Sequence, residues 1–343
     1  MYEKILITGG CGYIGSVLTQ KLMESKKVWT LSSWKKMSIP TSLGSEKDVS
    51  PGSYNWEKVT VYDNLMYRQT SLANYCYKDD FVFVKGDVRD EEKLLPYVQE
   101  ADVIIPLAAI VGFPACDKDK DLATKINYDH VKFILDNKKS NAKVIFPNTN
   151  SGYGVGEEGT ACTEESPLNP ISHYGIIKCA AEKEVLAAGG ISLRLATVFG
   201  VSPRMRLDLL VNDFTYRAYS DGYLVLFEPH FCRNYIHVQD VALVFIRGII
   251  DYNNMGGEAY NVGLSDANLT KFELAETIKK YVPNLSITLD NFGSDIDKRD
   301  YIVSNEKLEA LKWKPFYSVD SGIKELIKSF SIFSSSLNQF TNL

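Results

Sequence analysis

KILITGGCGYIG, at residues 4–15, is the stretch that decides the fold. The apolar run 5–7 predicts a buried parallel strand, and residues 13–23 have the apolar spacing of a helix. Between them, Gly9, Gly12 and Gly15 have the spacing G-x-x-G-x-x-G. Glycines let the backbone turn tightly, and a helix N-terminus presents N–H groups, so this order predicts a phosphate cradle. The alternative is a glycine-rich loop that binds nothing.

Composition narrows the class of protein. The chain has 343 residues, of which 45% are hydrophobic and 24% charged, and its net charge is −5. This length predicts two domains, or one domain with an added lobe. Without a long basic run we expect no nucleic-acid partner, and without an apolar run of about 18 residues we expect no membrane segment. No signal peptide precedes the first strand, so we expect a cytoplasmic protein.

Cysteines and histidines indicate neither a disulfide framework nor a metal site. The six cysteines lie far apart without a C-x-x-C pair, and the four histidines lack the spacing of metal ligands. We therefore expect reduced, mostly buried thiols and no metal.

A second strand, predicted over residues 59–63, ends in Asp63. An acid at this position of a dinucleotide-binding fold accepts hydrogen bonds from the adenosine ribose hydroxyls. A carboxylate would repel a 2′-phosphate, and Arg68 is the only cation nearby, so the sequence favours NAD over NADP. The alternative is an aspartate that only forms a turn. Asp63 follows Gly15 at much more than the usual distance of about 20 residues, so residues 28–57 are predicted to be an inserted surface loop.

Strands and helices then alternate. Further strands are predicted over 81–87, 101–109, 143–149 and 191–200, and helices over 122–137 and 173–188. This alternation predicts an α/β fold, a Rossmann doubly wound parallel sheet covered by helices on both faces. Binding sites in such sheets lie at the carboxyl ends of the strands, where Asp63, Asp87, Ala108, Thr149 and Thr197 fall.

The remainder predicts a smaller C-terminal α/β lobe. Short strands are expected at 223–227 and 259–263, and helices at 207–220, 238–250, 270–281, 305–311 and 319–330. Thr270 followed by Glu273 predicts a capping box. We assign residues 1–200 to the NAD-binding domain, to which 232–263 return. Residues 201–231 and 264–330 form the substrate lobe, and 331–343 a frayed tail.

Tyr174 and Lys178 stand four residues apart on one predicted helix, so both side chains share a face. A tyrosine has a pKa near 10, and the Lys178 ammonium together with a positive nicotinamide ring would lower this value toward neutrality and make the phenol a base. Thr149 ends the preceding strand, and its hydroxyl would hydrogen-bond the reacting oxygen and share its proton with Tyr174. The alternative is an ordinary solvated helix face.

Together these motifs resemble the extended short-chain dehydrogenase/reductases. The resemblance rests on the glycine motif, Asp63, Gly-Asp-Val at 86–88, Leu-Ala-Ala at 107–109, the Tyr174–Lys178 pair and RNYIHVQDVA at 233–242. Within this family the chain is similar to the NAD-dependent nucleotide-sugar epimerases and dehydratases, such as the UDP-glucose 4-epimerases. The resemblance implies NAD as cofactor, a nucleotide-diphosphate sugar as substrate, and a homodimer formed through the helices around 122–137 and 173–188.

The resemblance also implies roles for individual residues. Thr149, Tyr174 and Lys178 would be catalytic. NAD would be bound by Gly9, Gly12, Tyr13, Ile14, Gly15, Asp63, Asn64, Asp87, Val88, Leu107, Ala108, Ala109, Asn127, Tyr174, Lys178, Thr197 and Val198. The substrate would be bound by Val111, Thr149, Asn150, Ser151, Arg204, Asn212, Arg233 and Arg299, with Arg206 as a further candidate. No residue is expected to bind a metal.

Departures from the family pattern guide the choice of reaction. The 4,6-dehydratases carry Asp-Glu after the catalytic threonine, where this chain has Asn150 and Ser151, so 4,6-dehydration is disfavoured. Thr197 stands where the UDP-galactose-type enzymes usually carry asparagine, which leaves the nucleotide open. The sequence thus predicts a nucleotide-sugar epimerase that oxidises C4 to a 4-keto intermediate. A dehydrogenase or reductase, for example on a GDP-linked sugar, is the alternative, and a catalytically idle NAD(H)-binding regulatory protein is a remote one.

Overall fold

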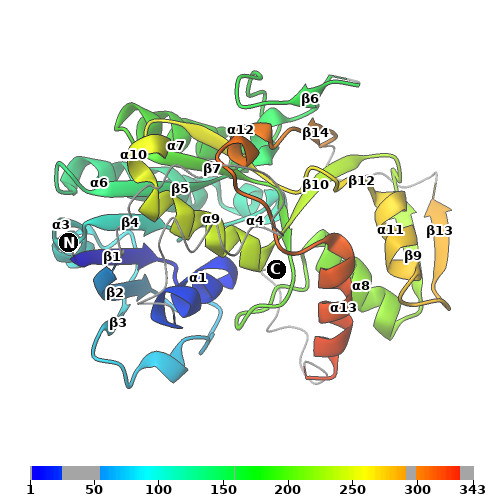
Figure 1. Cartoon of the computed structure of the whole chain (residues 1–343), viewed down its shortest axis with the longest axis horizontal. Helices are drawn as coiled ribbons and strands as arrows, with labels where there is room; N and C mark the ends of the chain where they lie inside the picture. Colours follow the sequence, from blue (N-terminus) through cyan, green and yellow to red (C-terminus); the bar gives the residue numbers. More distant parts are fainter. Residues whose placement is uncertain (1, 25–54, 158, 291–298, 333–343) are drawn as a thin grey trace, which may run out of the picture.

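A parallel sheet of seven strands forms the centre of the fold (Figure 1). The computed structural model describes residues 2–24, 55–157, 159–290 and 299–332. The strand order is β11-β7-β5-β4-β1-β2-β3, with every neighbouring pair parallel. The strands are β1 (Tyr2–Thr8), β2 (Asn55–Asp63), β3 (Phe81–Lys85), β4 (Val103–Pro106), β5 (Lys143–Thr149), β7 (Ile191–Leu195) and β11 (Ala259–Val262). The chain order reverses between β1 and β4, where doubly wound folds bind ligands. The predicted Rossmann fold is confirmed.

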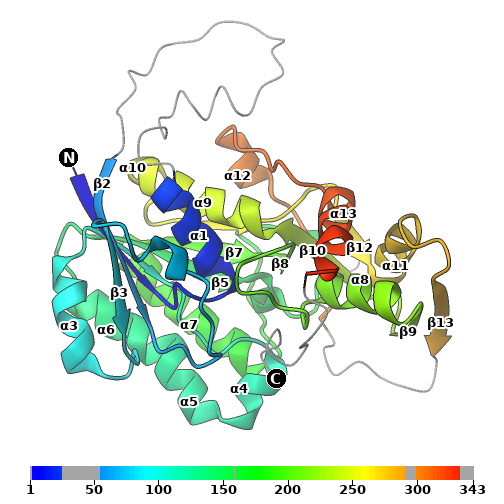
Figure 2. The same cartoon turned by 90° about the horizontal axis from the view of Figure 1, so that it is seen from below.

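Helices cover both faces of the sheet, as Figure 2 shows. Helices α1 (Tyr13–Glu24) and α9 (Val238–Ile250) lie side by side on one face. The other face carries α3 (Glu91–Glu100), α6 (His130–Asn137) and α7 (His173–Ala187). Successive side chains of a strand point to opposite faces, so Ile5 and Ile7 join the core under α1 while Leu6 joins the core on the other face.

A short helical run leads into α6. It comprises α4 (Phe113–Lys118), α5 (Lys120–Thr124) and the π-helical turn η2 (Lys125–Asp129). The predicted helix over 122–137 therefore begins earlier, and it contains an irregular turn that periodicity did not indicate. Single π-helical turns occur mostly where a helix serves a functional site.

The second lobe lies beyond the carboxyl edge of β7 (Figure 1). One small sheet has β8 (Thr197–Phe199), β10 (Cys232–His237) and β12 (Asn268–Thr270). A second sheet pairs β9 (Tyr223–Phe227) with β13 (Ser286–Asp290). A third pairs β6 (Ala161–Cys162) with β14 (Ile302–Val303). Its helices are α8 (Leu210–Ser220), α11 (Lys271–Lys279) and α13 (Val319–Phe330). The shorter elements are η1 (Ala73–Tyr75), η3 (Asn150–Tyr153), α10 (Tyr252–Met255) and α12 (Glu306–Ala310).

Three expectations about these elements need correction. The strand predicted over 191–200 breaks at Ala196, because β8 pairs with β10 instead of continuing in the large sheet. For the same reason, the part of 232–263 that returns to the large sheet's layers begins at α9 and runs through α10 to β11, whereas β10 belongs to the small sheet. Helix α3 was not predicted.

The predicted inserted loop ends earlier in the chain than expected. Residues 55–57 belong to β2, and the buried Trp56 donates from Nε1 to the carbonyl of Leu22 at 3.0 Å. The rest of the predicted loop, to residue 54, and nearly all of the predicted tail, from residue 333, lie outside the described residues. The capping box of Thr270 and Glu273 is confirmed. Over the four described ranges, no helix combines the length and apolarity that a membrane span requires.

Candidate active site

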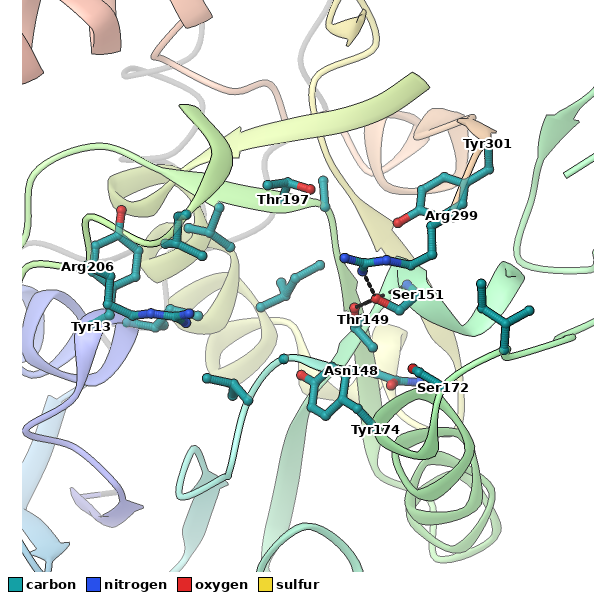
Figure 3. A pocket seen from close by; sticks show the side chains of 18 of the residues that line it. Tyr13, Asn148, Thr149, Ser151, Ser172, Tyr174, Thr197, Arg206, Arg299 and Tyr301 are labelled. Atoms are coloured by element: carbon teal, nitrogen blue, oxygen red, sulfur yellow. Dashed lines mark hydrogen bonds between the residues drawn. The ribbon is translucent and has the colours of Figure 1, made fainter. Parts of the chain in front are cut away.

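Three adjoining hollows form one trough along the carboxyl edge of the sheet. The first, of about 90 Å³, lies over Gly9, Asp63 and Asp87. The second, of about 140 Å³, shares Gly9 with the first and contains Lys178. The third is a cavity of about 550 Å³ that shares Tyr174 with the second and reaches the second lobe (Figure 3). The trough therefore passes from the glycine motif to the predicted catalytic residues.

The glycine loop is packed so tightly that only glycine fits. Gly9 has a φ of +69°, and a Cβ there would lie 2.5 Å from the amide nitrogen of Ala108. A Cβ at Gly15 would lie 2.6 Å from the Cα of Gly10. The loop turns directly into α1, whose first amides lack partners within the helix and favour an anion. Gly9, Gly12, Tyr13, Ile14 and Gly15 all line the trough, so this segment fits a pyrophosphate.

Asp63 joins this loop to the end of β2. Its carboxylate accepts from the amides of Cys11 at 3.0 Å and Leu65 at 2.8 Å. Burial raises the pKa of Asp63, and the two amide bonds act against this shift. Gln69 Nε2 also donates to Asp63 Oδ1, at 3.3 Å. A carboxylate offers about four lone-pair positions, so one position, on Oδ2, remains for a ribose hydroxyl. No lysine or arginine is present among the described residues that line this hollow, which fits NAD rather than NADP.

The other predicted adenosine-side residues line the same hollow. Asn64, Val88 and the segment 107–109 lie in its wall. Asp87 also does, but Arg89 binds its carboxylate with two hydrogen bonds of 2.8 Å. These bonds lower the pKa of Asp87 to about 2. Asn127, expected to touch the cofactor, lies behind the wall instead, where its side chain holds the backbone of Ile110.

Tyr174 and Lys178 come from the first two turns of α7. Ser172 caps this helix by accepting from the amide of Gly175 at 3.1 Å. Tyr174 lines both the large cavity and the second hollow, while Lys178 lines the second hollow. The Lys178 ammonium lies 3.8 Å over the ring of Phe146. Burial lowers the pKa of Lys178 to about 7, and the carboxylate of Glu182 acts in the opposite direction.

The tyrosine does not have the expected lowered pKa. Burial raises the pKa of Tyr174 to about 12. The cations that act against this shift are Arg206 and Arg299, and Lys178 is not among the principal causes. Lys178 alone therefore does not give Tyr174 the lowered pKa that the two cations together are expected to give. The other expected cation, a nicotinamide ring beside Tyr174, would act against the rise.

A chain of polar groups leads from Arg299 to Thr149 (Figure 3). The Arg299 guanidinium donates to Ser151 Oγ, which lies 2.9 Å from Thr149 Oγ1. Thr149 Oγ1 also accepts from the amide of Ser151 at 3.1 Å. Arg299, Ser151 and Thr149 all line the large cavity. Asn150, a predicted substrate contact, is buried and is not part of the cavity wall.

Other residues that were predicted to contact the ligands line the trough as well. Val111, a predicted substrate contact, lines the large cavity. Thr197 and Val198, predicted to bind NAD, line this cavity too and are not in the walls of the other two hollows. Arg206, the further candidate, lines the same cavity and pairs with Asp208 at 2.5 Å. Arg204 lines the second hollow, with its guanidinium 4.5 Å from the ring centre of Tyr67.

Two predicted contacts lie outside the walls of the trough. Asn212 is fully buried, where it accepts from the amide of Gly200 at 3.0 Å and donates to the carbonyl of Arg206 at 2.8 Å. Arg233 is buried beside Tyr301 and donates to the carbonyl of Cys232 at 2.9 Å.

Some residues of the site gave no signal in the sequence. Tyr301 and Asn148 both line the large cavity, and neither belongs to a motif. Asn148 donates to Glu182 at 2.7 Å, and the buried Glu182 pairs with Arg194. Within the described part of the chain, no cluster of His, Cys, Asp and Glu suits a metal ion.

Comparison with known proteins places this geometry in a family. A family model described as the NAD dependent epimerase/dehydratase family matches residues 5–263. The low-salt glycan biosynthesis protein Agl12 of Haloferax volcanii is 25% identical over 342 residues, covering 94% of this chain and 97% of that protein. The dTDP-glucose 4,6-dehydratase of Streptomyces niveus is 26% identical over 292 residues, covering 81% and 77%.

A solved structure shows the same fold. The UDP-glucose 4-epimerase of Thermus thermophilus, in complex with NAD, matches with a TM-score of 0.74 at 22% identity, covering 96% of this chain and 99% of that chain. The resemblance to the extended short-chain dehydrogenase/reductases is confirmed, and NAD is the cofactor. The protein belongs to the NAD dependent epimerase/dehydratase family.

Proposed function

We propose that the protein is an NAD-dependent epimerase that acts on a nucleotide-linked sugar through oxidation at C4. The observation that carries the proposal is the composition of the large cavity. Tyr174 and Thr149 lie together in its wall, and no carboxylate, histidine or thiol is present among the described residues that line it. Alcohol oxidation and re-reduction need a single proton acceptor beside the hydride acceptor, and this cavity provides one in Tyr174.

The residues of the trough would have separate roles in the reaction. NAD, when bound, accepts and returns the hydride. Tyr174 takes the proton of the C4 hydroxyl, and Thr149 holds the reacting oxygen. Lys178 lies one turn beyond Tyr174 and would bind the nicotinamide ribose. Because these groups serve both directions of the reaction, a sugar that rotates between oxidation and reduction leaves with the opposite configuration at C4.

Two arginines support a diphosphate ligand. Arg206 lies beside Tyr13 on one side of the large cavity, and Arg299 lies beside Tyr301 on the other (Figure 3). A guanidinium binds phosphate oxygens in a two-pronged arrangement. Their charge therefore suits a nucleoside diphosphate sugar, held by residues of the second lobe.

The residues after Thr149 argue against dehydration. Elimination of water from a 4-keto sugar needs an acid and a base in addition to the tyrosine. Asn150 and Ser151 titrate at no pH near neutrality, and Asn150 is not in the cavity wall. Although several relatives carry the name of a 4,6-dehydratase, the residues present here favour epimerisation.

The proposal is tested with UDP-, GDP-, CDP- and dTDP-sugars, by following absorbance at 340 nm and identifying products by NMR. Inversion at C4 without net NADH is the expected result. Stoichiometric NADH together with a keto sugar identifies a dehydrogenase instead, and a keto-deoxy sugar without net NADH identifies a dehydratase. Bound NAD without turnover of any sugar identifies an NAD-binding protein with no catalysis on this panel. Tyr174→Phe should abolish turnover, whereas Tyr77→Phe, at an exposed tyrosine, should not.

We also propose a homodimer through α6 and α7. These helices pack side by side on one face of the sheet, and Ile176 of α7 is 52% exposed. Light scattering after size exclusion should give twice the mass of the chain for the wild type. Ile176→Asp should reduce the measured mass to that of a single chain. A monomeric wild-type protein would refute the dimer.

A further inference from the structure

The contacts of Ser151 make it the link between a cation and the Thr149 hydroxyl. Ser151 is 2% exposed, in the first turn of η3 directly after β5. Its hydroxyl accepts from Arg299 and lies 2.9 Å from Thr149 Oγ1, while its amide donates to the same oxygen at 3.1 Å. Ser151 therefore contacts Thr149 twice, once through the backbone and once through the side chain.

Counting donors and acceptors decides the direction of the bond between the two hydroxyls. A hydroxyl has one donor and two acceptor positions. A bond from a charged guanidinium polarises Ser151, which makes its O–H a stronger donor and its oxygen a weaker acceptor. The favoured direction is therefore from Ser151 to Thr149. Both acceptor positions of Thr149 Oγ1 are then filled, and only its proton remains for a ligand in the cavity.

We propose that Ser151 is a positioning residue that makes Thr149 a hydrogen-bond donor to the reacting sugar oxygen and leaves Tyr174 as the only proton acceptor. This inference rests on the proposed function and assigns the proton route within it. It replaces the expectation that Thr149 shares the proton with Tyr174, because an oxygen with filled acceptor positions cannot take one.

The arrangement acts on the chemical step. As the alcohol is oxidised, its proton passes to the Tyr174 phenolate, its hydride passes from carbon to NAD, and the oxygen becomes a carbonyl. Negative charge builds up on that oxygen on the way, and the Thr149 O–H bond to it strengthens while the proton stays on Thr149. An interaction that strengthens toward the transition state raises kcat more than it lowers KM.

The test combines Ser151→Ala and Thr149→Val, singly and together. With a sugar that the wild type converts, Ser151→Ala should lower kcat about 10- to 100-fold with KM within about twofold, below the effect of losing a whole donor. Ser151→Thr retains a hydroxyl and should restore most of the rate. In the Thr149→Val background, Ser151→Ala should cost nothing further, because Ser151 acts through Thr149. Unchanged NAD affinity and melting temperature would show that each variant is folded.

The pH dependence separates positioning from proton transfer. If Tyr174 alone takes the proton, Ser151→Ala lowers the plateau of kcat against pH and leaves the apparent pKa of the profile in place. Three results would overturn the inference. They are a shift of the apparent pKa in Ser151→Ala, a wild-type kcat in Ser151→Ala, and a further loss of kcat when Ser151→Ala is added to Thr149→Val that is as large as its loss in the wild type. A wild-type protein that converts no sugar nucleotide would overturn the proposed function, and the inference with it.

Discussion

The side chain of Asn127 hydrogen-bonds both the N–H and the C=O of Ile110. Its Nδ2 donates to the carbonyl of Ile110 at 2.8 Å, and its Oδ1 accepts from the amide at 2.9 Å. Asn127 is 1% exposed and lies in the π-helical turn η2, which directs this side chain toward the loop. Residues 107–109 of the same loop line the adenosine side of the trough. The turn thus holds the loop that forms this wall, and Asn127 itself is not among the residues that line the hollow.

Asn127→Ala should therefore weaken both stability and NAD binding. It leaves the buried N–H of Ile110 unpaired and removes one of two donors from its C=O, which keeps the Cys116 thiol at 3.2 Å. The loss costs about 1–3 kcal/mol in the free energy of unfolding. The Kd for NAD should rise several-fold as the loop loosens. Denaturant unfolding and calorimetric titration measure the two effects. Asn137→Ala removes one partly buried bond, to Phe133, and should cost less than about 1 kcal/mol. Unchanged NAD affinity in Asn127→Ala would limit its role to stability.

Gly9 and Gly189 form a matched pair for testing the glycine loop. Both have positive φ, +69° and +75°, but a Cβ at Gly189 meets nothing within 4 Å, whereas one at Gly9 runs into the backbone at Ala108. Gly189→Ala should cost only the conformational strain, about 1–2 kcal/mol, and leave NAD affinity intact. Gly9→Ala should cost more and abolish NAD binding. Similar effects of the two substitutions would show that strain, and not the close approach, governs the loop.

Asp63→Asn should reduce the preference for NAD over NADP. The substitution removes the charge that we expect to bind a ribose hydroxyl and to repel a 2′-phosphate. Because a hydrogen bond to a charged group is worth about 1.5–3 kcal/mol, the Kd for NAD should rise about 10- to 100-fold, with a smaller loss for NADP. Calorimetry with both dinucleotides provides the ratio. Asp79→Asn, at an exposed aspartate, serves as the control, and an unchanged ratio in Asp63→Asn would contradict the assignment.

Lys178→Met should change how stability depends on pH. The pKa of Lys178 is lowered by burial to about 7, so between pH 7 and 10.5 the unfolded chain binds more protons than the folded one. Stability therefore rises with pH across this window, and below pH 7 the full cost of burying the charge is present. The Met variant should be more stable than the wild type at pH 6, by about 2–5 kcal/mol, and this gain should shrink toward pH 10.

Lys183→Met, an exposed position on the same helix, should show no such trend. Urea unfolding from pH 6 to 10 makes the comparison. A Lys178→Met variant that is less stable than the wild type at pH 6 would mean that the ammonium is stabilised where it lies over Phe146. NAD affinity should fall in this variant in either case, since the donor to the ribose is lost.

Elements with a strong local signal were predicted within a residue or two. Strands β5 and β9 and helices α9 and α13 match the predicted ranges. Helix α3 was missed because only Leu94 and Val98 of it are buried and Pro96 interrupts its pattern. The break at Ala196 was missed because 191–199 contains no glycine or proline to mark it. The pairing of β8 with β10 depends on a strand far along the chain.

Among the site residues too, those placed by local pattern were predicted, and those placed by distant contacts were not. Tyr174 and Lys178 share a face because helical spacing dictates it, and Thr149 ends a strand of the large sheet. Asn212 and Arg233 were expected at the substrate, but the fold turns both into buried hydrogen bonds behind the walls. Which way a polar side chain of the second lobe points depends on the elements packed around it, and local pattern does not contain that information.

By itself, the sequence determined the doubly wound fold, the glycine loop, the acid at the end of β2 and the helix that carries Tyr174 and Lys178. Each depends on residues close together in the chain, where glycine conformation and the periods of strands and helices act directly. Only the tertiary structure decided that Arg299 meets Ser151, that Asn127 holds the loop at Ile110, and that carboxylates, histidines and thiols are absent from the described wall of the large cavity. These contacts join residues far apart in sequence, and their geometry arises from packing.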